Sequence, residues 1–301
     1  MVRMFKCRAK ANDFGYKAWW QILRHDVRYA SRTLLRNPGF TVAAVLTLAL
    51  GIGANTAIFS VINNALLRPL PLPRPNHLAA LFNFNKKTSK YISTSYLDYE
   101  YFAQHAKSFE QLSAYVRLPF DLTIGSHTER IPGEPVSTNY FSMLDLAPVA
   151  GRDFEPEDIN SSLPVALISE SLWRERFGGK PGLIGKTLVL DNHPVIVVGV
   201  VPKRYRGANL NWSAPPQIWI TMNSLPVFWP QFKALFNQRR SRWLLMMGRL
   251  KPDATVAQAE LQILAANLAQ MEPITNRDIT AVAFSAARAK FWPAYRNCNG
   301  T

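Results

Sequence analysis

The side chains that most often carry chemistry are few and scattered in this sequence. The two cysteines, Cys7 and Cys298, lie near opposite ends, and they form no CxxC pair or Cys/His zinc spacing. The histidines form no HxH or HExxH pattern; they are His25, His77, His105, His127 and His193. The sequence therefore predicts no metal site and no cofactor.

Motifs for nucleotide binding and nucleophilic catalysis do not occur either. The sequence has no GxxxxGK[ST] loop and no GxSxG elbow. Residues 178–180 read Gly-Gly-Lys, as in a phosphate loop, but Pro181-Gly182 follows in place of a helix, which favours a turn. Two groups of carboxylates, Asp98/Glu100 and Glu155/Glu157/Asp158, fall at a helix start or in a loop. We interpret both groups as solvated surface charge and predict a protein that is not an enzyme.

One uncharged segment dominates the sequence. No charged residue occurs between Arg36 and Arg68, and about 20 apolar residues are enough to cross a bilayer core of about 30 Å. Asn37-Pro38 is a helix start signal, with an N-cap residue before a proline, and Pro69 cannot continue a helix. We predict a transmembrane helix over residues 37–68, the alternative being a buried helix of a soluble protein. The segment begins too far from the N-terminus for a cleaved signal peptide.

The formal net charge of +15 is concentrated before this helix. Residues 1–36 hold nine basic and two acidic residues, a net charge of +7. The positive-inside rule places this segment in the cytoplasm and the following domain on the opposite side of the membrane. A strongly basic chain can also bind nucleic acid. We do not favour that reading, because the basic stripe leads directly into a membrane span.

The basic segment has the pattern of an amphipathic helix on the membrane surface. One stripe recurs every fourth residue and consists of Arg24, Arg28, Arg32 and Arg36. The arginines would face anionic lipid headgroups, while Trp19 and Trp20 would lie at the interface. A plain polar helix that leads into the membrane explains the spacing equally well.

Small and polar residues recur on one face of the predicted membrane helix. The face consists of Ala43, Thr47, Gly51 and Asn55, with Gly53 and Ala57 beside them. Small side chains let a second helix approach closely, and polar groups in a membrane usually face protein. We predict that this face packs against other membrane helices, which this sequence does not contain.

Residues 69–285 read as a mixed folded domain. Helices and strands alternate without regular βαβ repetition, which predicts an α+β fold. Predicted strands cover 78–84, 115–124, 129–136, 165–168, 187–190, 195–201, 217–221, 243–250 and 279–284, and predicted helices cover 96–105, 139–144, 170–177 and a segment capped by Thr255. For Trp173 and for the aromatic segment 223–242 we favour core packing over a partner-facing role.

Several long motifs resemble one family. Residues 35–73, LRNPGFTVAAVLTLALGIGANTAIFSVINNALLRPLPLP, look like the first transmembrane helix of MacB/FtsX-type permeases, in particular the acidobacterial-type duplicated orphan permeases. The stretches 136–154, 164–202 and 248–262 resemble the MacB-like periplasmic core domain, in the family's order. The resemblance covers roughly residues 20–285.

The resemblance implies a two-lobed α+β periplasmic domain after one transmembrane helix. It also implies three later helices, which the sequence lacks, and residues 286–301 do not align with the family. We therefore expect the N-terminal part of an ABC-type permease, apparently truncated, that serves conformational coupling or substrate handling. The alternatives are an anchored periplasmic interaction module without transport activity and a non-functional permease fragment.

The expected partners follow from the same resemblance. They are membrane lipid, other permease helices or subunits, a separate ATPase, and a second copy of the chain; nucleic acid is not among them. The predicted organisation is a cytoplasmic basic segment (1–36), a membrane helix (37–68), a periplasmic core domain (69–285) and an unassigned tail (286–301).

Overall fold

The computed structural model describes residues 24–25, 28–29, 32, 35–62, 72–85, 87–207, 214–269 and 279–285. The chain divides into two compact units, Met1–Leu67 and Arg68–Thr301. The predicted tail 286–301 lies outside the described residues, as do Trp19 and Trp20.

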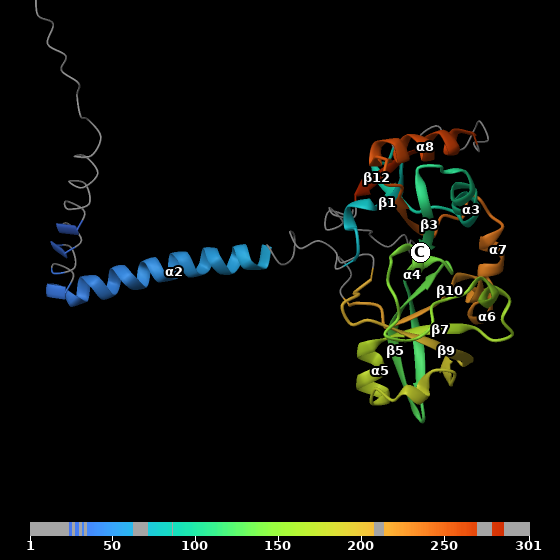
Figure 1. Ribbon diagram of the computed structural model, residues 1–301, viewed down its shortest axis with the longest axis horizontal. Helices are drawn as coiled ribbons and strands as arrows, with labels where there is room; N and C mark the ends of the chain where they lie inside the picture. The colour runs from blue at the N-terminus through green and yellow to red at the C-terminus, as the bar shows by residue number, and fades with distance from the viewer. Residues whose placement is uncertain are drawn as a thin grey trace, which may run out of the picture. The chain divides into compact units, whose positions relative to one another are not determined.

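The first unit contains the long helix α2, Pro38–Ile62 (Figure 1). It begins at the proline that the sequence predicts, and the backbone N–H of Thr41 donates to the carbonyl of Asn37 at 3.1 Å. Its 25 residues span about 37 Å at 1.5 Å per residue, which exceeds a hydrocarbon core of about 30 Å. The predicted stop at Pro69 lies outside the described residues.

The second unit has two lobes, and we call the first the sheet lobe. Its strands pair in the order β3-β11-β1-β12, with β2 beside β1, and every one of these pairs is antiparallel. The strands are β1 (Leu78–Asn85), β2 (Lys90–Ile92), β3 (Phe109–Tyr115), β11 (Leu245–Leu250) and β12 (Ile279–Ser285). The helices α3 (Tyr96–His105) and α8 (Val256–Ala269) belong to this lobe (Figure 1).

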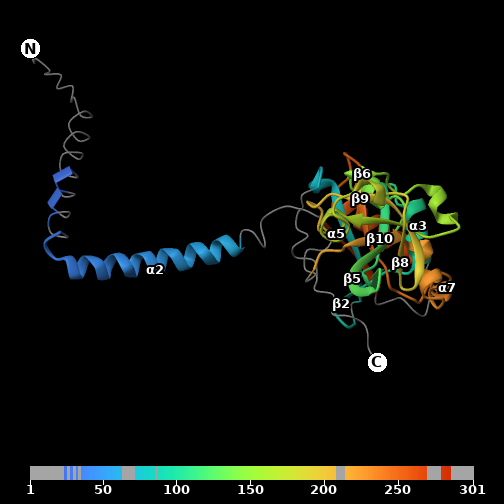
Figure 2. The same cartoon turned by 90° about the horizontal axis from the view of Figure 1, so that it is seen from below.

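The second lobe, the barrel lobe, contains a closed ring of six strands. Strand β10 pairs antiparallel with β7 and parallel with β5, which closes the path β10-β7-β9-β8-β4-β5 on itself. Figure 2 shows β5, β8, β9 and β10 of this lobe from below. The strands are β4 (Leu118–Ile124), β5 (His127–Val136), β7 (Val165–Ser169), β8 (Thr187–Leu190), β9 (His193–Val201) and β10 (Ile218–Thr221), with β6 (Ala150–Gly151) against β9. The helices are α4 (Tyr140–Met143), α5 (Glu170–Phe177), α6 (Leu225–Phe228) and α7 (Phe232–Phe236).

The barrel lobe is an insertion into the sheet lobe. All of its strands lie between β3 and β11 in the sequence, and β3 and β11 are paired neighbours. Two connections therefore join the lobes: residues 116–117 lead into the barrel, and residues 237–244 lead back.

Three groups of buried apolar side chains fill the domain. One fills the barrel, and alternate residues such as Phe120, Leu122 and Ile218 point into it. A second lies under α3 and α8 on one face of the sheet lobe. The third, which we call the joint core, takes Leu78 and Met247 from the sheet lobe together with residues of the barrel lobe. The joint core is thus an apolar contact between the two lobes, which are also joined by the pairing of β3 with β5 at Tyr115 and Val136.

Most helices and strands lie where short sequence signals predict them. The predicted cap at Thr255 is confirmed: its hydroxyl accepts from the N–H of Gln258, while the Gln258 side chain accepts from the N–H of Thr255, which forms a capping box. Gly178 ends α5 in the left-handed conformation with φ 64°, so the predicted turn at 178–180 is confirmed.

The predicted strand 115–124 is wrong as a single element. Strand β3 ends at Tyr115 and β4 begins at Leu118, because the chain leaves the sheet lobe for the barrel lobe between them. Strands β2, β3 and β6 were not predicted; the pairing partners of β3 come from distant parts of the sequence.

Two glycines permit the close approach of β6 to β9. Gly151 has φ 75°, and a Cβ there would overlap the carbonyl oxygen of Val198. A Cβ on Gly199 would overlap the carbonyl oxygen of Arg152. Both obstacles are backbone atoms that cannot rotate away.

We predict that Gly199→Ala lowers the free energy of unfolding by about 1–3 kcal/mol, the usual cost of overpacking. Chemical denaturation followed by tryptophan fluorescence measures this. Gly182→Ala is the matched control, since a Cβ there meets nothing within 4 Å, and it should change stability by less than about 0.5 kcal/mol. Equal effects of the two variants would contradict the steric explanation.

Candidate functional site

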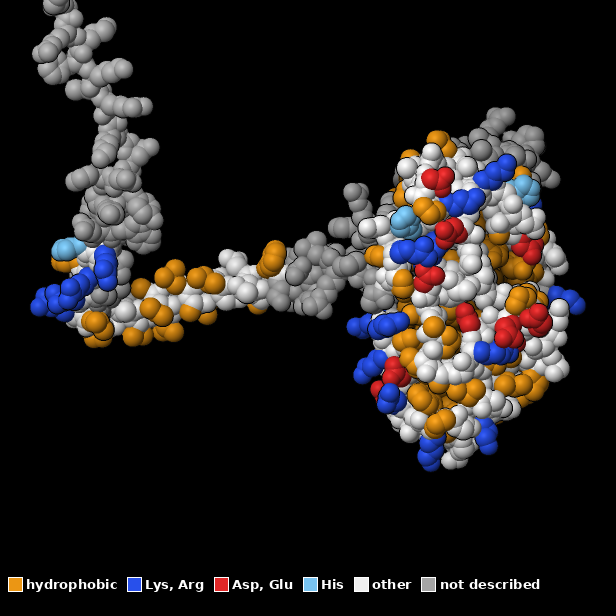
Figure 3. Space-filling view, viewed as in Figure 1, with side chains coloured by type: hydrophobic (Ala, Val, Ile, Leu, Met, Phe, Trp, Pro, Cys, Tyr) orange, Lys and Arg blue, Asp and Glu red, His pale blue; other side chains and the backbone are white. Residues whose placement is uncertain are grey.

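The surface of α2 is largely apolar and exposed. Within the described residues, α2 is the one helix long and apolar enough to cross a membrane, over Pro38–Ala57 with a mean hydropathy of 1.6. Hydrophobic side chains are exposed along it, and basic side chains gather at its N-terminal end (Figure 3). A helix with this surface requires lipid or other helices around it.

The residues of the predicted packing face are all exposed on α2; they are Ala43, Thr47, Gly51, Gly53, Asn55 and Ala57. Apart from the backbone of α2 itself and the adjacent residues, no described atom lies within 4 Å of a Cβ built on Gly51 or Gly53, so the two glycines leave an open notch in the surface of α2. The Thr47 hydroxyl donates to the carbonyl of Ala43 at 2.8 Å, which satisfies it within the helix. We therefore expect the packing of a second helix on this face to depend on the shape of the α2 surface and not on a hydrogen bond from the Thr47 hydroxyl.

The arginine stripe precedes α2. Arg24, Arg28, Arg32 and Arg36 are helical and exposed. Contact of this stripe with lipid headgroups stays a prediction, as does the interfacial position of the two tryptophans.

The connections between the two lobes are held by polar and aromatic contacts. On the return connection, the Arg239 guanidinium donates to Asp98 of α3 at 2.9 Å, and the Asp98 side chain is only 7% exposed. The rings of Tyr96 and Phe236 meet edge to face, with centroids 4.4 Å apart. On the outgoing connection, the Arg117 guanidinium donates to the carbonyl of Ala214. Each connection is thus fixed to a distant segment by an arginine.

The interpretation of the acidic groups as solvated charge is wrong for two residues. Asp98 is buried against Arg239, and Asp158 is buried against Arg152, which donates two 2.8 Å hydrogen bonds to its carboxylate. The Arg152 hydrogen bonds lower the pKa of Asp158 below its ordinary value. At the helix starts, the backbone N–H of Asp98 donates to the Ser95 hydroxyl, and the Asp158 side chain accepts from the N–H of Glu155.

The aromatic segment packs on the barrel, as predicted. It forms the two short helices α6 and α7; Phe228 is buried, while Trp229, Phe232 and Phe236 are partly buried against the barrel core. Trp173 is partly buried against the same core, and its Nε1 donates to the carbonyl of Lys180 at 3.0 Å.

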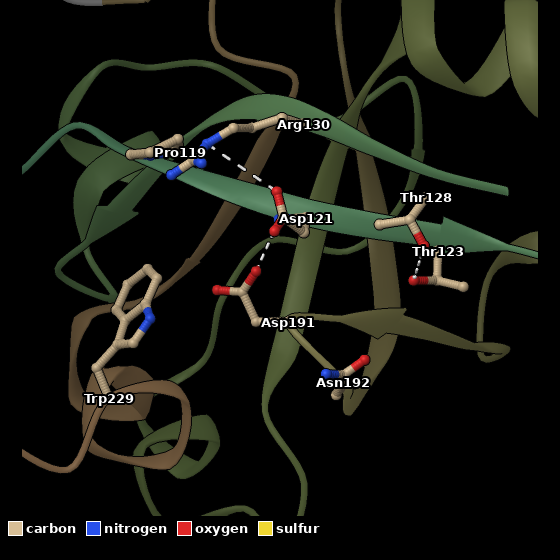
Figure 4. A pocket seen from close by; sticks show the side chains of 8 residues that line it. All are labelled: Pro119, Asp121, Thr123, Thr128, Arg130, Asp191, Asn192 and Trp229. Carbon is tan, nitrogen blue, oxygen red and sulfur yellow. Dashed lines mark hydrogen bonds and ion pairs between the residues drawn. The ribbon is translucent and has the colours of Figure 1, made fainter.

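An open cavity of about 330 Å³ lies between the β4–β5 hairpin, the β8–β9 turn and Trp229 (Figure 4). Its polar groups bind one another: the N–H of Asp121 donates to the Asp191 carboxylate at 2.7 Å, and Thr123 and Thr128 share a hydrogen bond of 2.9 Å. Burial raises the pKa of Asp191, opposed by the hydrogen bond from Asp121. These contacts fix the β8–β9 turn to β4.

No group of three His, Cys, Asp or Glu side chains in the described part of the chain could hold a metal ion. The two features that the structure shows are an apolar helix and, after it in the sequence, a two-lobed domain. They define a class of proteins in which a membrane helix is followed by an α+β domain built as a lobe with an inserted barrel.

Comparison with known proteins supports this class. The MacB-like periplasmic core domain model matches residues 41–266, and the chain belongs to this family of ABC transporter permease domains. The periplasmic region of MacB from Actinobacillus actinomycetemcomitans shares 14% identity at a TM-score of 0.53, over 74% of this chain and 92% of that one. The extracellular domain of the noncanonic ABC-type transporter YknZ from Gram-positive bacteria shares 15% identity at a TM-score of 0.50, over 68% and 99%. At these identities the likeness shows the fold.

Curated relatives match over a shorter stretch. The macrolide export ATP-binding/permease protein MacB of Burkholderia thailandensis is 32% identical over 65 residues, which is 22% of this chain and 10% of the relative. Its counterpart in Burkholderia pseudomallei (strain 1710b) is 28% identical over 69 residues, 23% and 11%. The matched stretch spans about a tenth of the length of these relatives.

We predict that the Asp98–Arg239 contact stabilises the domain by linking the lobes. A double-mutant cycle with Asp98→Asn and Arg239→Gln should give a coupling energy of about 1 kcal/mol, because Asp98 is buried although Arg239 is partly exposed. The control cycle uses Glu170 and Arg174, an i,i+4 pair within α5 whose arginine is 64% exposed, where about 0.3–0.5 kcal/mol is expected. A coupling energy no larger than that of the control would contradict the linking role.

Proposed function

We propose that this chain is the membrane-anchored N-terminal part of an ABC-type permease, and that its folded domain couples movement of membrane helices to displacement of a distant lobe. It performs no chemical catalysis. A separate ATPase and further permease helices would supply the driving motion.

The observation that carries the proposal is the architecture of the domain. The barrel lobe is joined to the sheet lobe by two connections; the joint core contains apolar residues of both lobes, and the Asp98–Arg239 pair fixes the return connection to α3. A lobe packed this way moves as a body, because a close-packed interior transmits displacement. The family match and the apolar helix α2 support the permease context.

The same proposal places the chain in the bacterial inner membrane, with its N-terminus in the cytoplasm and its domain in the periplasm. The charge of +7 over residues 1–36 supports this orientation.

Reporter fusions test the orientation. Alkaline phosphatase fused after residue 285 should be active, because the enzyme folds only outside the cytoplasm, and the same reporter fused after residue 36 should be inactive. The reverse pattern would overturn the orientation. Recovery of the chain in the supernatant after carbonate washing of membranes would overturn the anchor itself.

The small-residue face of α2 predicts association with other membrane helices. Gly51→Leu fills the notch and should reduce co-purification of a permease or ATPase partner in mild detergent at least fivefold, since the backbones can no longer approach. Val45→Leu adds bulk on the opposite face of α2 and should leave recovery unchanged.

The wild-type result separates the functional alternatives. A stoichiometric permease or ATPase partner supports the transport role. A chain that remains a lone monomer in detergent would contradict it and favour an anchored interaction module.

A further inference from the structure

Glu134 is a carboxylate with no exposed surface. The parallel pairing of β5 with β10 sets it in register with Trp219, whose Nε1 donates to Glu134 Oε2 at 2.9 Å. The other carboxylate oxygen, Oε1, accepts no hydrogen bond from the residues that the structure describes. Because Trp219 belongs to the joint core, Glu134 lies where the two lobes meet.

The groups that face Glu134 come from four elements: Tyr115 of β3, Arg117 of the outgoing connection, Tyr140 of α4 and Tyr205 after β9. The hydroxyls of Tyr140 and Tyr205 bond each other at 2.7 Å. Burial first, and then the negative charge of Glu134, hold the pKa of each of the three tyrosines well above its ordinary value. The tyrosines therefore stay neutral.

Arg117 supplies the positive charge in this group, but its guanidinium also binds a backbone carbonyl. Its Nη2 donates to the carbonyl of Ala214, and burial lowers the pKa of Arg117 while attraction to Glu134 raises it. When Glu134 is ionised, its negative charge is buried. The groups that offset this charge are the neutral indole of Trp219, which donates a hydrogen bond, and the guanidinium of Arg117, which also binds the carbonyl of Ala214. The neutral carboxylic acid carries no such cost.

We propose that Glu134 is a proton-binding site in the joint between the lobes, and that proton uptake there tightens the joint while proton loss loosens it. This proton site is argued only from the contacts between the lobes and does not depend on the proposed coupling function. It goes beyond that function because it assigns a ligand, the proton, to the carboxylate of Glu134.

The direction of the effect follows from the shift of the pKa. Burial raises the pKa of Glu134 to about 7, against the opposing effects of the Trp219 hydrogen bond, the Arg117 charge and the Tyr140 hydroxyl. A carboxyl whose pKa is higher in the folded than in the unfolded state stabilises the fold below its unfolded pKa. That stabilisation is lost as the pH rises through the folded pKa. The joint should therefore be tighter at about pH 5.5 than at about pH 8.

Hydrogen exchange on the full chain in detergent tests the proposal. After correction for intrinsic exchange rates, protection of the backbone amides of Gly133, Glu134 and Val136 and of residues 217–221 should fall at least tenfold from about pH 5.5 to about pH 8. Amides of β8, away from the joint, should change less. Unchanged protection in β5 and β10 of the wild-type protein would overturn the proposal.

Two variants assign the effect to Glu134. Glu134→Gln keeps the shape and removes the titration, so its protection should be the same at both pH values. Asp153→Asn removes another carboxyl whose pKa burial raises, to about 6, and it should keep the wild-type pH dependence. A pH dependence that survives in Glu134→Gln, or is lost in Asp153→Asn, contradicts the assignment.

If Glu134→Gln fails to fold, a measurement on the wild-type protein still tests the proposal. Carbon-13 carboxyl resonances of glutamate-labelled wild-type protein should include one group that titrates with a midpoint between about pH 6 and about pH 8. Titration of every glutamate below about pH 5.5 would overturn the proposal.

Discussion

The parallel pairing of β5 with β10 is the contact on which the folded domain depends. It closes the six-stranded ring, so the barrel has a filled interior and no open edge at that point. The same pairing presents Ile218 and Ile220 to the barrel core and Trp219 to the joint core. One strand of four residues thus contributes to both cores, and the position of the inserted lobe relative to the sheet lobe follows from its register.

The joint combines apolar packing with buried polar groups, and the two have different consequences. Apolar burial is non-directional and holds the lobes in contact. The Asp98–Arg239 pair and the Glu134–Trp219 hydrogen bond are directional, and removing one partner leaves a buried group unsatisfied. Such contacts favour one arrangement of the lobes over its neighbours. A domain that transmits movement requires its lobes to be held in one arrangement, because a loosely held lobe would absorb the displacement.

Local chemistry made much of this architecture predictable. Ser95, Ser169 and Thr255 each begin a helix with a side chain that accepts a backbone hydrogen bond, and the helices that they begin lie where the sequence predicts them. Hairpins at Gly125 and at Asp191-Asn192 follow from residues that tolerate positive φ. The buried carboxylates were not predictable in this way. A signal for Glu134 did exist, since it is a lone charge in the run Ile131–Val136, but nothing local shows that both faces of that strand are covered.

The sequence by itself determined the uncharged helix, the basic segment before it, the helix caps and the family, because each is written in consecutive residues or in short spacings. The tertiary structure alone decided that the barrel closes, that it is inserted between β3 and β11, and that Asp98, Glu134 and Asp158 are buried. The physical reason is that closure and burial depend on pairings between residues far apart in the chain. The register of β5 on β10 joins Glu134 to a tryptophan 85 positions away, and the return connection brings Arg239 to an aspartate 141 positions before it.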